Sequence, residues 1–309
     1  MNDPTKNLIV VVGPTAVGKT DLCVRLAKQL GAEIISADAR QFFREMNIGT
    51  AKPSLEERGG VSHHLINSHS IVDSYNAGDF ERDALQILEQ LYKHTNVAIV
   101  TGGSGLYIKA LCEGMDEMPE IEESIREQLN TIYMNEGLPV LLSQLDQLDP
   151  EYAASVDRAN PQRIIRALEV CLASGKPYSS FRKKSKAIRP FRFTKIGLQR
   201  NREELYARID ARMDAMLAEG LVEEVKRLQP YRMQNALQTV GYTEVFDFLD
   251  GKYDETEMIR LLKRNSRRYA KRQITWFSRD PEIRWFHPSD YTQIIAYIQQ
   301  EPGAMKPGT

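Results

Sequence analysis

Short apolar runs and amphipathic stretches alternate through the first hundred residues of the chain. Residues 8–12 form a continuous run of Leu, Ile and Val, and shorter apolar runs follow at 33–36 and 97–101. Between these runs, apolar side chains recur every three or four residues over 20–30 and 79–92. Short β-branched runs are typical of buried strands, and the longer period is typical of helices. Strands joined by helical crossovers predict a parallel α/β sheet flanked by helices.

The pattern changes after residue 116. Helical periodicity without a strand covers 120–175, and a basic, loop-like stretch follows it. Residues 191–198 have a strand pattern again, and long amphipathic helices are predicted at 205–217 and 256–277, with Trp276 and Phe277 as core anchors of the last one. The predicted organisation is a first part of the sheet core at 1–116, a helical insertion domain at 117–190, a return to the core with long basic helices at 191–300, and a frayed tail at 301–309.

Composition places the chain among soluble globular proteins. Of 309 residues, 27% are charged and 42% are hydrophobic, which argues against a disordered chain. No apolar run approaches the roughly 20 residues that a membrane helix needs, and the polar start does not resemble a signal peptide. Three widely spaced cysteines, Cys23, Cys112 and Cys171, do not make a disulfide framework or a metal knuckle. A cytoplasmic protein without membrane contact is expected.

Charge is divided unevenly along the chain. Residues 158–279 hold 27 Lys and Arg against 14 Asp and Glu, a net charge of +13, while the whole chain has a net charge of −1. Such an asymmetry favours a polyanionic partner for the basic half, although a solvated helical face is an equally common cause. Composition alone does not decide between them.

The sequence at 13–20, GPTAVGKT, is a phosphate-binding loop of the form G-x-x-x-x-G-K-T placed between a predicted strand and a predicted helix. Its glycines let backbone N–H groups curl around a phosphate, its lysine adds a charge, and its threonine hydroxyl can bind Mg²⁺. The predicted phosphate-binding residues are Gly13, Pro14, Thr15, Ala16, Val17, Gly18, Lys19 and Thr20. The motif leaves open whether the phosphate belongs to a nucleotide or to another diphosphate.

Two further polar segments follow predicted strands. Asp38 lies in SADARQ at 36–41, and Ser104 lies in TGGSGLY at 101–107. Because ligands of open α/β sheets bind outside the carboxyl ends of the strands, both residues are expected near the phosphate-binding loop. Asp38 can be a metal ligand, a general base or a turn-forming residue, and the glycines around Ser104 suggest a second small anion cradle.

Two predicted helices carry candidate RNA contacts. One begins at Asn160 as N-cap with Pro161 in its first turn, and its early residues are Gln162, Arg163, Ile164, Ile165 and Arg166. The other has basic side chains every three or four residues over 260–272, including Arg268, Lys271 and Arg272, with few acids in the same helix to neutralise them. A solvated face remains the alternative for the first helix, whereas phosphate contact is favoured for the second.

Together these segments resemble the bacterial tRNA dimethylallyltransferases, also called tRNA isopentenyltransferases. The resemblance extends from Gly13 to Phe277 through GPTAVGKT, SADARQ, IGTAKP at 48–53, HHLI at 63–66, GGSGLYIKAL at 102–111, NPQRIIRALEV at 160–170, VGYTE at 240–244 and AKRQITWF at 270–277. Each motif is modest, but their order and spacing are specific. The resemblance implies a P-loop NTPase-like core with a helical insertion domain that contacts tRNA.

The resemblance also implies a reaction, in which dimethylallyl diphosphate gives its five-carbon group to N6 of the adenine at tRNA position 37, with Mg²⁺ present. Asp38 would be the general base, Ser104 would assist the leaving diphosphate, Arg212 would be a further diphosphate contact, and Thr20 would ligate the metal. The expected partners are the tRNA anticodon stem-loop and dimethylallyl diphosphate, and the expected state is a monomer. The residues expected to contact tRNA are Asp38, Ala39, Arg40, Gln41, Ser104, Arg126, Gln162, Arg163, Ile164, Ile165, Arg166, Arg268, Lys271 and Arg272.

The sequence departs from the family pattern at several positions, among them Ser104, where a threonine is usual, and Gln238, where some relatives have a basic residue. Ala39 stands where a serine is common, Phe43 where a tyrosine is usual, and Asn67 where an aspartate is usual. Three other functions compete with the main one: prenyl transfer to free adenine nucleotides, a P-loop small-molecule kinase, and an RNA-binding protein without catalysis. The basic half and the helical insertion argue against the first, because a free nucleotide needs no such surface.

Overall fold

The computed structural model describes residues 5–182 and 186–300, so the tail expected at 301–309 lies outside the described residues. The chain divides into two compact units, of which the first combines Met1–Gly114 with Ile188–Thr309 and the second is Met115–Ala187. Each unit is described below by itself.

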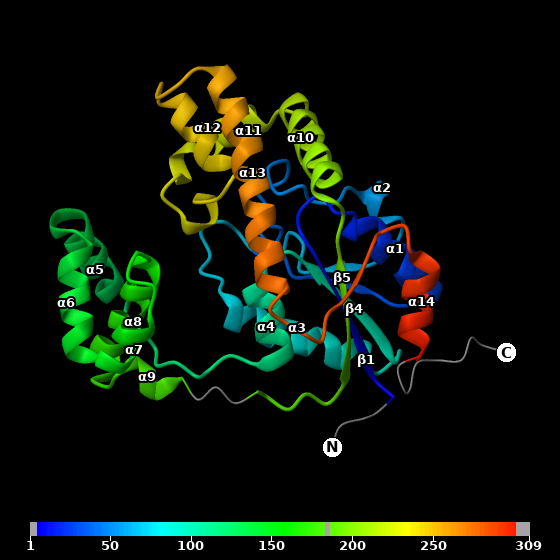
Figure 1. The fold of residues 1–309 in the computed structure, drawn as a ribbon, viewed down its shortest axis with the longest axis horizontal. Helices are drawn as coiled ribbons and strands as arrows, with labels where there is room; N and C mark the ends of the chain where they lie inside the picture. The colour runs from blue at the N-terminus through cyan, green and yellow to red at the C-terminus, as the bar shows by residue number, and fades with distance from the viewer. Residues whose placement is uncertain (1–4, 183–185, 301–309) are drawn as a thin grey trace. The chain divides into compact units, whose positions relative to one another are not determined.

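A six-stranded sheet forms the centre of the first unit, and every pair of neighbouring strands is parallel. The strand order is β3-β2-β4-β1-β5-β6, with β1 between β4 and β5 (Figure 1). The strands are β1 (Asn7–Val12), β2 (Ile34–Ser36), β3 (His63–His64), β4 (Val97–Gly102), β5 (Arg192–Leu198) and β6 (Arg284–Phe286). The predicted parallel α/β core is confirmed, whereas β3 and β6, which contain no β-branched residue, gave no strand pattern in the sequence.

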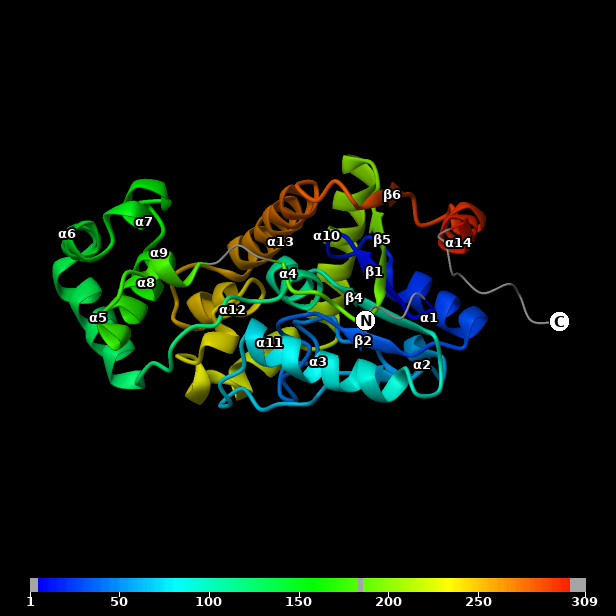
Figure 2. The same cartoon turned by 90° about the horizontal axis from the view of Figure 1, so that it is seen from below.

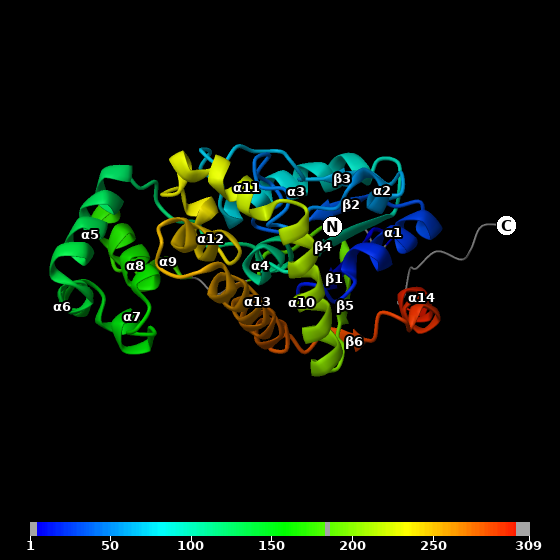
Figure 3. The same ribbon diagram turned by 90° about the horizontal axis from the view of Figure 1, so that it is seen from above.

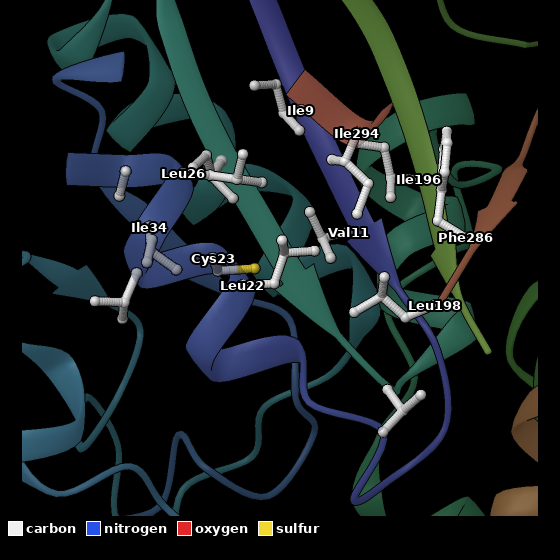
Figure 4. Packing of buried hydrophobic residues seen from close by; sticks show 14 of the residues in the cluster. Ile9, Val11, Leu22, Cys23, Leu26, Ile34, Ile196, Leu198, Phe286 and Ile294 are labelled. Atoms are coloured by element: carbon white, nitrogen blue, oxygen red, sulfur yellow. The ribbon is translucent and has the colours of Figure 1, made fainter. Parts of the chain in front are cut away.

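Every residue of β1 is buried, and its side chains alternate between two hydrophobic clusters. Ile9 and Val11 point to one face, where they pack with side chains of β5 and of helix α1 (Lys19–Leu30), as Figure 4 shows. Leu8, Val10 and Val12 pack on the opposite face. A strand covered on both faces explains why the run at 8–12 is continuous rather than alternating.

Helices cover both faces of this sheet. Helices α1 and α14 (Tyr291–Gln300) contribute to the cluster on one face, and α3 (Ala77–Leu91) and α4 (Gly105–Glu113) contribute to the other (Figure 2). Helix α3 begins with a capping box, in which the Asn76 side chain accepts from the N–H groups of Gly78 and Asp79. A short helix, α2 (Leu55–Arg58), precedes β3.

The remaining helices of the first unit share a third apolar cluster, which includes Met213, Met216, Leu221 and Tyr242. These helices are α10 (Arg202–Ala218), α11 (Leu221–Arg227), α12 (Tyr242–Leu249) and α13 (Glu255–Phe277), with two 3₁₀ turns, η1 (Gln229–Tyr231) and η2 (Asn235–Leu237), between α11 and α12. Helix α13 runs beside α10 (Figure 3). The long helices predicted from periodicity are confirmed.

The second unit is helical in its described residues. It consists of α5 (Glu123–Glu136), α6 (Leu138–Leu148), α7 (Pro150–Ser155), α8 (Pro161–Ser174) and α9 (Tyr178–Phe181), around a core of its own. Helix α8 begins as predicted, because Asn160 is its N-cap and accepts from the N–H of Arg163, with Pro161 in the first turn. No helix within 5–182 or 186–300 is long and apolar enough to span a membrane.

Candidate active site

The phosphate-binding loop connects the end of β1 to the start of α1. Gly18 is the N-cap of α1 with φ 110°, and Ala16 has φ 62°, both in the left-handed region. These angles curl the loop, and the N–H groups of Ala16, Val17 and Gly18 form no hydrogen bond within the described chain. Free N–H groups at the positive end of a helix are the donors that a phosphate requires.

Two arginines outside the loop hold its shape. Arg200 Nε donates to the carbonyl oxygen of Val17, and Arg208 Nε donates to that of Ala16, both at 2.8 Å. A left-handed conformation at Ala16 costs free energy for a residue with a Cβ atom, and the bond from Arg208 offsets part of that cost. The loop is therefore held in its curled form by β5–α10 before any ligand binds.

Lys19 folds back over the loop. Its ammonium donates to the carbonyl oxygens of Gly13 at 2.9 Å and Pro14 at 2.8 Å. Burial lowers the pKa of Lys19 to about 8, while the nearby Asp38 carboxylate opposes this shift and the Arg212 guanidinium adds to it. A lysine with such a pKa is held in a site that lacks enough negative charge, which an incoming diphosphate would supply.

Asp38 follows β2 at the carboxyl end of the sheet. One carboxylate oxygen accepts from the N–H of Arg40 at 3.0 Å, which forms a short turn. The other oxygen has no hydrogen bond within the described residues. The N–H of Ala39 donates to the Ser104 hydroxyl at 2.9 Å, which ties the Asp38 segment to the loop after β4.

Close packing explains the glycines around Ser104. An added Cβ atom at Gly102 would lie 2.1 Å from the carbonyl oxygen of Ala37, and one at Gly103 would lie 2.0 Å from Nε2 of Gln273. At Gly105 it would lie 2.1 Å from the Trp276 ring. The loop was expected to be a second anion cradle, but its glycines make room for Ala37, directly after β2, and for side chains of α13.

The phosphate-binding loop and the Asp38 segment line one cavity of about 590 Å³, whereas Ser104 and the glycines beside it are not among its lining residues. Its polar side is formed by the phosphate-binding loop, Asp38 and Arg212, and its apolar side includes Met213 and Met216. Arg212 donates to the carbonyl oxygen of Ala51 at 3.3 Å, and burial lowers the pKa of its guanidinium. The cavity therefore combines a cationic cradle, a carboxylate and an apolar wall.

A buried carboxylate holds the wall that contains Gly49, Thr50 and Ala51. Glu224 Oε2 accepts from the N–H groups of Asn47 and Ile48 at 3.0 and 2.9 Å, and Oε1 accepts from the N–H of Gly49 at 3.0 Å. The Tyr242 hydroxyl donates to the same carboxylate at 2.7 Å. Four donors around one buried carboxylate compensate for its burial.

Comparison with known proteins places this site in a family. The model of the IPP transferase family matches residues 41–280. The tRNA dimethylallyltransferase of Cytophaga hutchinsonii is 55% identical over 95% of this chain and 97% of its own length. That of Christiangramia forsetii is 48% identical over 95% of this chain and 98% of its own length. The chain belongs to the IPP transferase family.

Solved IPP transferases share its fold. The full-length tRNA isopentenylpyrophosphate transferase of Bacillus halodurans has a TM-score of 0.71 and 37% identity, with 96% of each chain covered. A eukaryotic dimethylallyltransferase that acts on tRNA has a TM-score of 0.76 and 26% identity, covering 96% of this chain and 77% of the other. The relatives therefore support tRNA prenyl transfer and not the free-nucleotide or kinase alternatives.

In this IPP transferase, the structure brings most of the predicted diphosphate residues together. Residues 15–20, Asp38 and Arg212 line one cavity, as do Arg40 and Gln41, whereas Gly13, Pro14 and Ser104 are not among its lining residues. Gln41 donates through Nε2 to the carbonyl oxygens of Thr50 and Ala51, at 3.2 and 3.3 Å. Gln41 thus supports the cavity wall, which is a role that the motif alone did not indicate.

Helix α13 is less free to bind phosphates than its sequence indicated. Acids on other segments neutralise part of its basic face: Lys263 pairs with Asp214 and Arg267 with Asp210, each at 2.6 Å. Arg268 and Lys271 have no ion pair among the described residues, and Arg272 lies over the ring of Tyr269. The α13 side chains predicted to contact tRNA, Arg268, Lys271 and Arg272, are thus not neutralised by an ion pair among the described residues.

Two predicted RNA contacts in the second unit were wrong as side-chain contacts. Ile164 and Ile165 have exposed fractions of 0% and 1%, because they belong to the core of that unit. Gln162 and Arg163 are exposed on α8 and stay candidates. Trp276 was likewise expected in the core of the first unit, where Phe277 is buried, but 37% of its surface is exposed.

Arg126 and Arg166 are linked through a buried acid. Glu169, exposed by 1%, pairs with Arg126 at 2.6 Å and with Arg166 at 3.2 Å. A carboxylate shared by two arginines fixes both guanidinium groups on neighbouring helices while leaving other N–H groups exposed. Each of these arginines can still bind a phosphate through its exposed N–H groups while its ion pair with Glu169 is kept.

The family departures have local consequences. Ala39 keeps its bond to Ser104 because that bond uses the backbone N–H. Phe43 is 4% exposed and packs in the third apolar cluster. Asn67 Oδ1 accepts from the Lys52 ammonium at 2.6 Å, and burial lowers the pKa of Lys52 to about 8. An amide therefore holds this lysine where relatives usually place a carboxylate.

Several supporting residues escaped the motif search. Four side chains hold loops of the site from at least 170 positions away along the chain: Arg200, Arg208, Glu224 and Gln273. A buried carboxylate in α11 gives no pattern different from that of a solvated one. Gln273 lies in the motif AKRQITWF of the predicted basic helix. A single uncharged glutamine among basic residues was the only sequence feature that could have indicated a separate role for it.

Proposed function

We propose that this IPP transferase catalyses transfer of the dimethylallyl group from dimethylallyl diphosphate to N6 of the adenine at tRNA position 37, next to the anticodon. The observation that carries this assignment is the shared cavity of the phosphate-binding loop and Asp38. A diphosphate cradle beside a carboxylate suits transfer of an alkyl group, since one group holds the leaving diphosphate and the other takes the proton of the nucleophile.

The diphosphate is held by the N–H groups of Ala16, Val17 and Gly18, by Lys19 and by Arg212. The five-carbon group extends toward the apolar wall at Met213 and Met216. This orientation places the carbon bonded to the diphosphate on the Asp38 side of the cavity. Reacting groups that are held together in this way react as one molecule, which removes much of the entropic barrier.

Asp38 acts through its free carboxylate oxygen. As the adenine N6 lone pair forms the N–C bond, the C–O bond breaks, and its electron pair leaves with the diphosphate. The N6 proton passes to Asp38, while the Ser104 hydroxyl, held near Asp38 by its bond to Ala39, stabilises charge on the diphosphate. The adenine must leave its stack, which costs least in a single-stranded loop such as that of the anticodon.

Mg²⁺ fits this site as a partner of the diphosphate. The described residues contain no cluster of three or more His, Cys, Asp or Glu side chains that could hold a metal alone. Thr20 lines the cavity in the first turn of α1, and its hydroxyl is an oxygen ligand of the kind that Mg²⁺ prefers alongside phosphate oxygens. When bound, the metal would neutralise charge on the leaving diphosphate.

Binding of tRNA would use Arg40 and Gln41 at the cavity, Arg268, Lys271 and Arg272 on α13, and the exposed Gln162 and Arg163 with the paired Arg126 and Arg166 in the second unit. We also propose that the protein works as a monomer in the cytoplasm, because one chain supplies every group that the reaction needs.

Labelled dimethylallyl diphosphate tests the function directly. The protein is incubated with the labelled donor and either AMP or tRNA from cells that lack the modification. We expect label in tRNA and none in AMP. The Asp38→Asn variant should be slower by about 10²–10⁴-fold, with tRNA affinity within about tenfold of the original. Full activity of this variant would exclude Asp38 as the base, and label in AMP alone would contradict the tRNA assignment.

A further inference from the structure

Gln273 joins the phosphate-binding loop, which lines the cavity, to the loop after β4. It lies on α13 and is 6% exposed. Its Oε1 accepts from the N–H of Thr15, in the phosphate-binding loop, at 2.8 Å. Its Nε2 donates to the carbonyl oxygen of Gly103, in the loop after β4, at 3.0 Å. One side chain amide therefore bridges two loops that follow neighbouring strands.

Chemistry fixes the orientation of this amide. An N–H group can only donate and a carbonyl oxygen can only accept, so the Gln273 oxygen must face Thr15 and the nitrogen must face Gly103. Rotating the amide by half a turn would lose both bonds and would leave the N–H of Thr15 and the carbonyl oxygen of Gly103 without these partners, which is unfavourable for buried groups. Movement of either loop therefore disturbs the other through Gln273.

The loop after β4 is shaped for this contact. A Cβ atom at Gly103 would lie 2.0 Å from the Gln273 nitrogen, and one at Gly105 would lie 2.1 Å from the Trp276 ring. Both partners lie on α13, one turn or less apart. A helix side chain enters the space that each glycine leaves, so α13 is seated directly on this loop.

The hydrogen bond from the Thr15 N–H to Gln273 also distinguishes two parts of the phosphate-binding loop, one held by the protein and one free to bind a ligand. Because the Thr15 N–H donates to Gln273, it points to the protein and not to a ligand. The N–H groups that remain for a phosphate are those of Ala16, Val17 and Gly18, together with those of Lys19 and Thr20 in the first turn of α1. The first part of the loop is thus an anchoring segment, and its second part is the ligand-binding segment.

Helix α13 also carries the unpaired cations of the candidate RNA surface. Arg268 and Lys271 have no ion pair in the described part of the chain, and Arg272 is the neighbour of Gln273. Tyr269, one turn before Gln273, lines the cavity, and burial raises its pKa to about 12 with a further contribution from Asp38. The same helix therefore faces RNA on one side and the cavity on the other.

We infer that Gln273 is a positioning residue that couples tRNA binding on α13 to diphosphate binding in the loop at 13–20. This inference rests on the proposed function and adds a thermodynamic link between its two substrates. RNA that fixes α13 fixes Gln273, and Gln273 in turn fixes the curled loop through Thr15. Each ligand therefore raises the affinity for the other by the same factor.

Calorimetry on the whole protein tests the coupling. The dissociation constant of inorganic pyrophosphate with Mg²⁺ is measured with and without a saturating anticodon stem-loop RNA. For the original protein we expect at least a fivefold tightening with RNA. Gln273→Met keeps the length and removes both bonds, so the tightening should fall to about onefold, and pyrophosphate alone should bind about tenfold more weakly. Gln273→Glu keeps the acceptor for Thr15 and should give an intermediate result.

Two controls separate coupling from a general loss of stability. Gln86→Met makes the same substitution at an exposed position of α3 and should leave both constants unchanged. Gly103→Ala places a methyl group against the Gln273 amide, so it should disturb the bridge and reduce the tightening although residue 273 itself is not substituted. If the effects concern one contact, the loss in the double variant Gly103→Ala/Gln273→Met should equal that of Gln273→Met alone.

The outcomes distinguish this inference from the proposed function. Original protein that binds neither pyrophosphate nor RNA would contradict the proposed function. Original protein that binds both, with no mutual tightening or with tightening that persists in folded Gln273→Met and Gly103→Ala, would overturn the role of Gln273. A lower melting temperature with unchanged tightening would likewise show that the residue serves only stability.

Discussion

The protonation state of one residue, Lys19, controls the charge of the diphosphate cradle. In the free protein, burial lowers the pKa of Lys19 to about 8. The side chain is therefore largely charged at pH 7, and it loses its proton and its charge as the pH rises further. A bound diphosphate stabilises the charged form and raises this pKa. Binding above pH 8 therefore requires uptake of a proton, and affinity decreases with rising pH, by up to about tenfold per pH unit.

Pyrophosphate binding between pH 7 and pH 9.5 checks this expectation. Because pyrophosphate itself titrates in this range, the original protein is compared with Lys19→Arg, whose guanidinium stays charged throughout. The ratio of the two dissociation constants should be flat below pH 8 and should change in favour of the arginine variant above it. A constant ratio across the range would mean that Lys19 does not titrate there.

At the same scale, sequence reasoning located residues that line the cavity, such as Lys19 and Asp38, and missed the residues that hold them in place. Lys19 and Asp38 belong to local motifs. A motif can be recognised in a sequence because its residues are close together along the chain. Arg208 and Gln273 meet the loop at 13–20 only after folding. Their chemistry as hydrogen-bond donors and acceptors is ordinary, and the chain distance hides their partners.

At the scale of secondary-structure elements, a buried acid of one helix fixes the conformation of a loop at 47–49. Helix α11 supplies Glu224, whose carboxylate accepts three N–H groups of the segment at 47–49 and the hydroxyl of Tyr242. Glu224→Gln would place an NH₂ group against N–H donors. We expect the free energy of unfolding to fall by about 2–4 kcal/mol, since a buried charge-assisted network is broken.

Urea denaturation measures this loss. The neighbouring Glu223 is exposed on the same helix, so Glu223→Gln is a matched substitution that should change the free energy of unfolding by no more than about 0.5 kcal/mol. The wall at Gly49 and Ala51 also borders the cavity, so Glu224→Gln should raise the KM for dimethylallyl diphosphate. Equal stability of the two variants would show that the carboxylate does not hold the loop.

Helix α13 offers a second matched pair, Arg267 and Arg268. Arg267 is paired with Asp210, whereas Arg268 has no ion pair among the described residues. A phosphate gains more from an unpaired cation, so Arg268→Gln should weaken tRNA binding and should lower the slope of log K against log salt by roughly 0.7–0.9. Arg267→Gln should affect the slope less. Titrations at several salt concentrations measure both, and a larger effect at Arg267 would reject this interpretation of α13.

The basic face of α13 illustrates why sequence overestimates a binding surface. Seven cations recur over 260–272, and the acids that neutralise Lys263 and Arg267 lie on α10, more than 40 positions earlier. Periodicity gives the face of a helix correctly, but it does not say which element packs beside that face. The same limit hid the burial of Ile164 and Ile165, since apolar residues near a helix start can face either a core or a ligand.

For the whole molecule, the strand pattern predicted the parallel core because β1, β2, β4 and β5 each contain β-branched residues. The two residues of β3 and the three of β6 include no β-branched residue, and their pairing follows from the neighbouring strands. The net charge of +13 over 158–279 correctly indicated an excess of cations but not its distribution. That excess falls on both units, and Arg163 in the second and Arg268 in the first have no ion pair with any residue of 5–182 or 186–300.

A double substitution at these two arginines tests whether one RNA contacts both units. If a single bound tRNA loses a phosphate contact at each position, Arg163→Gln and Arg268→Gln should each lower the salt slope by roughly 0.7–0.9, and the double variant should lower it by the sum. Residues on separate units share no partner, so their free energies should add. Titration of undermodified tRNA at four or more salt concentrations gives all three slopes. A double variant no weaker than Arg268→Gln would show that Arg163 does not contact the tRNA bound at α13, and the second unit would then need another role.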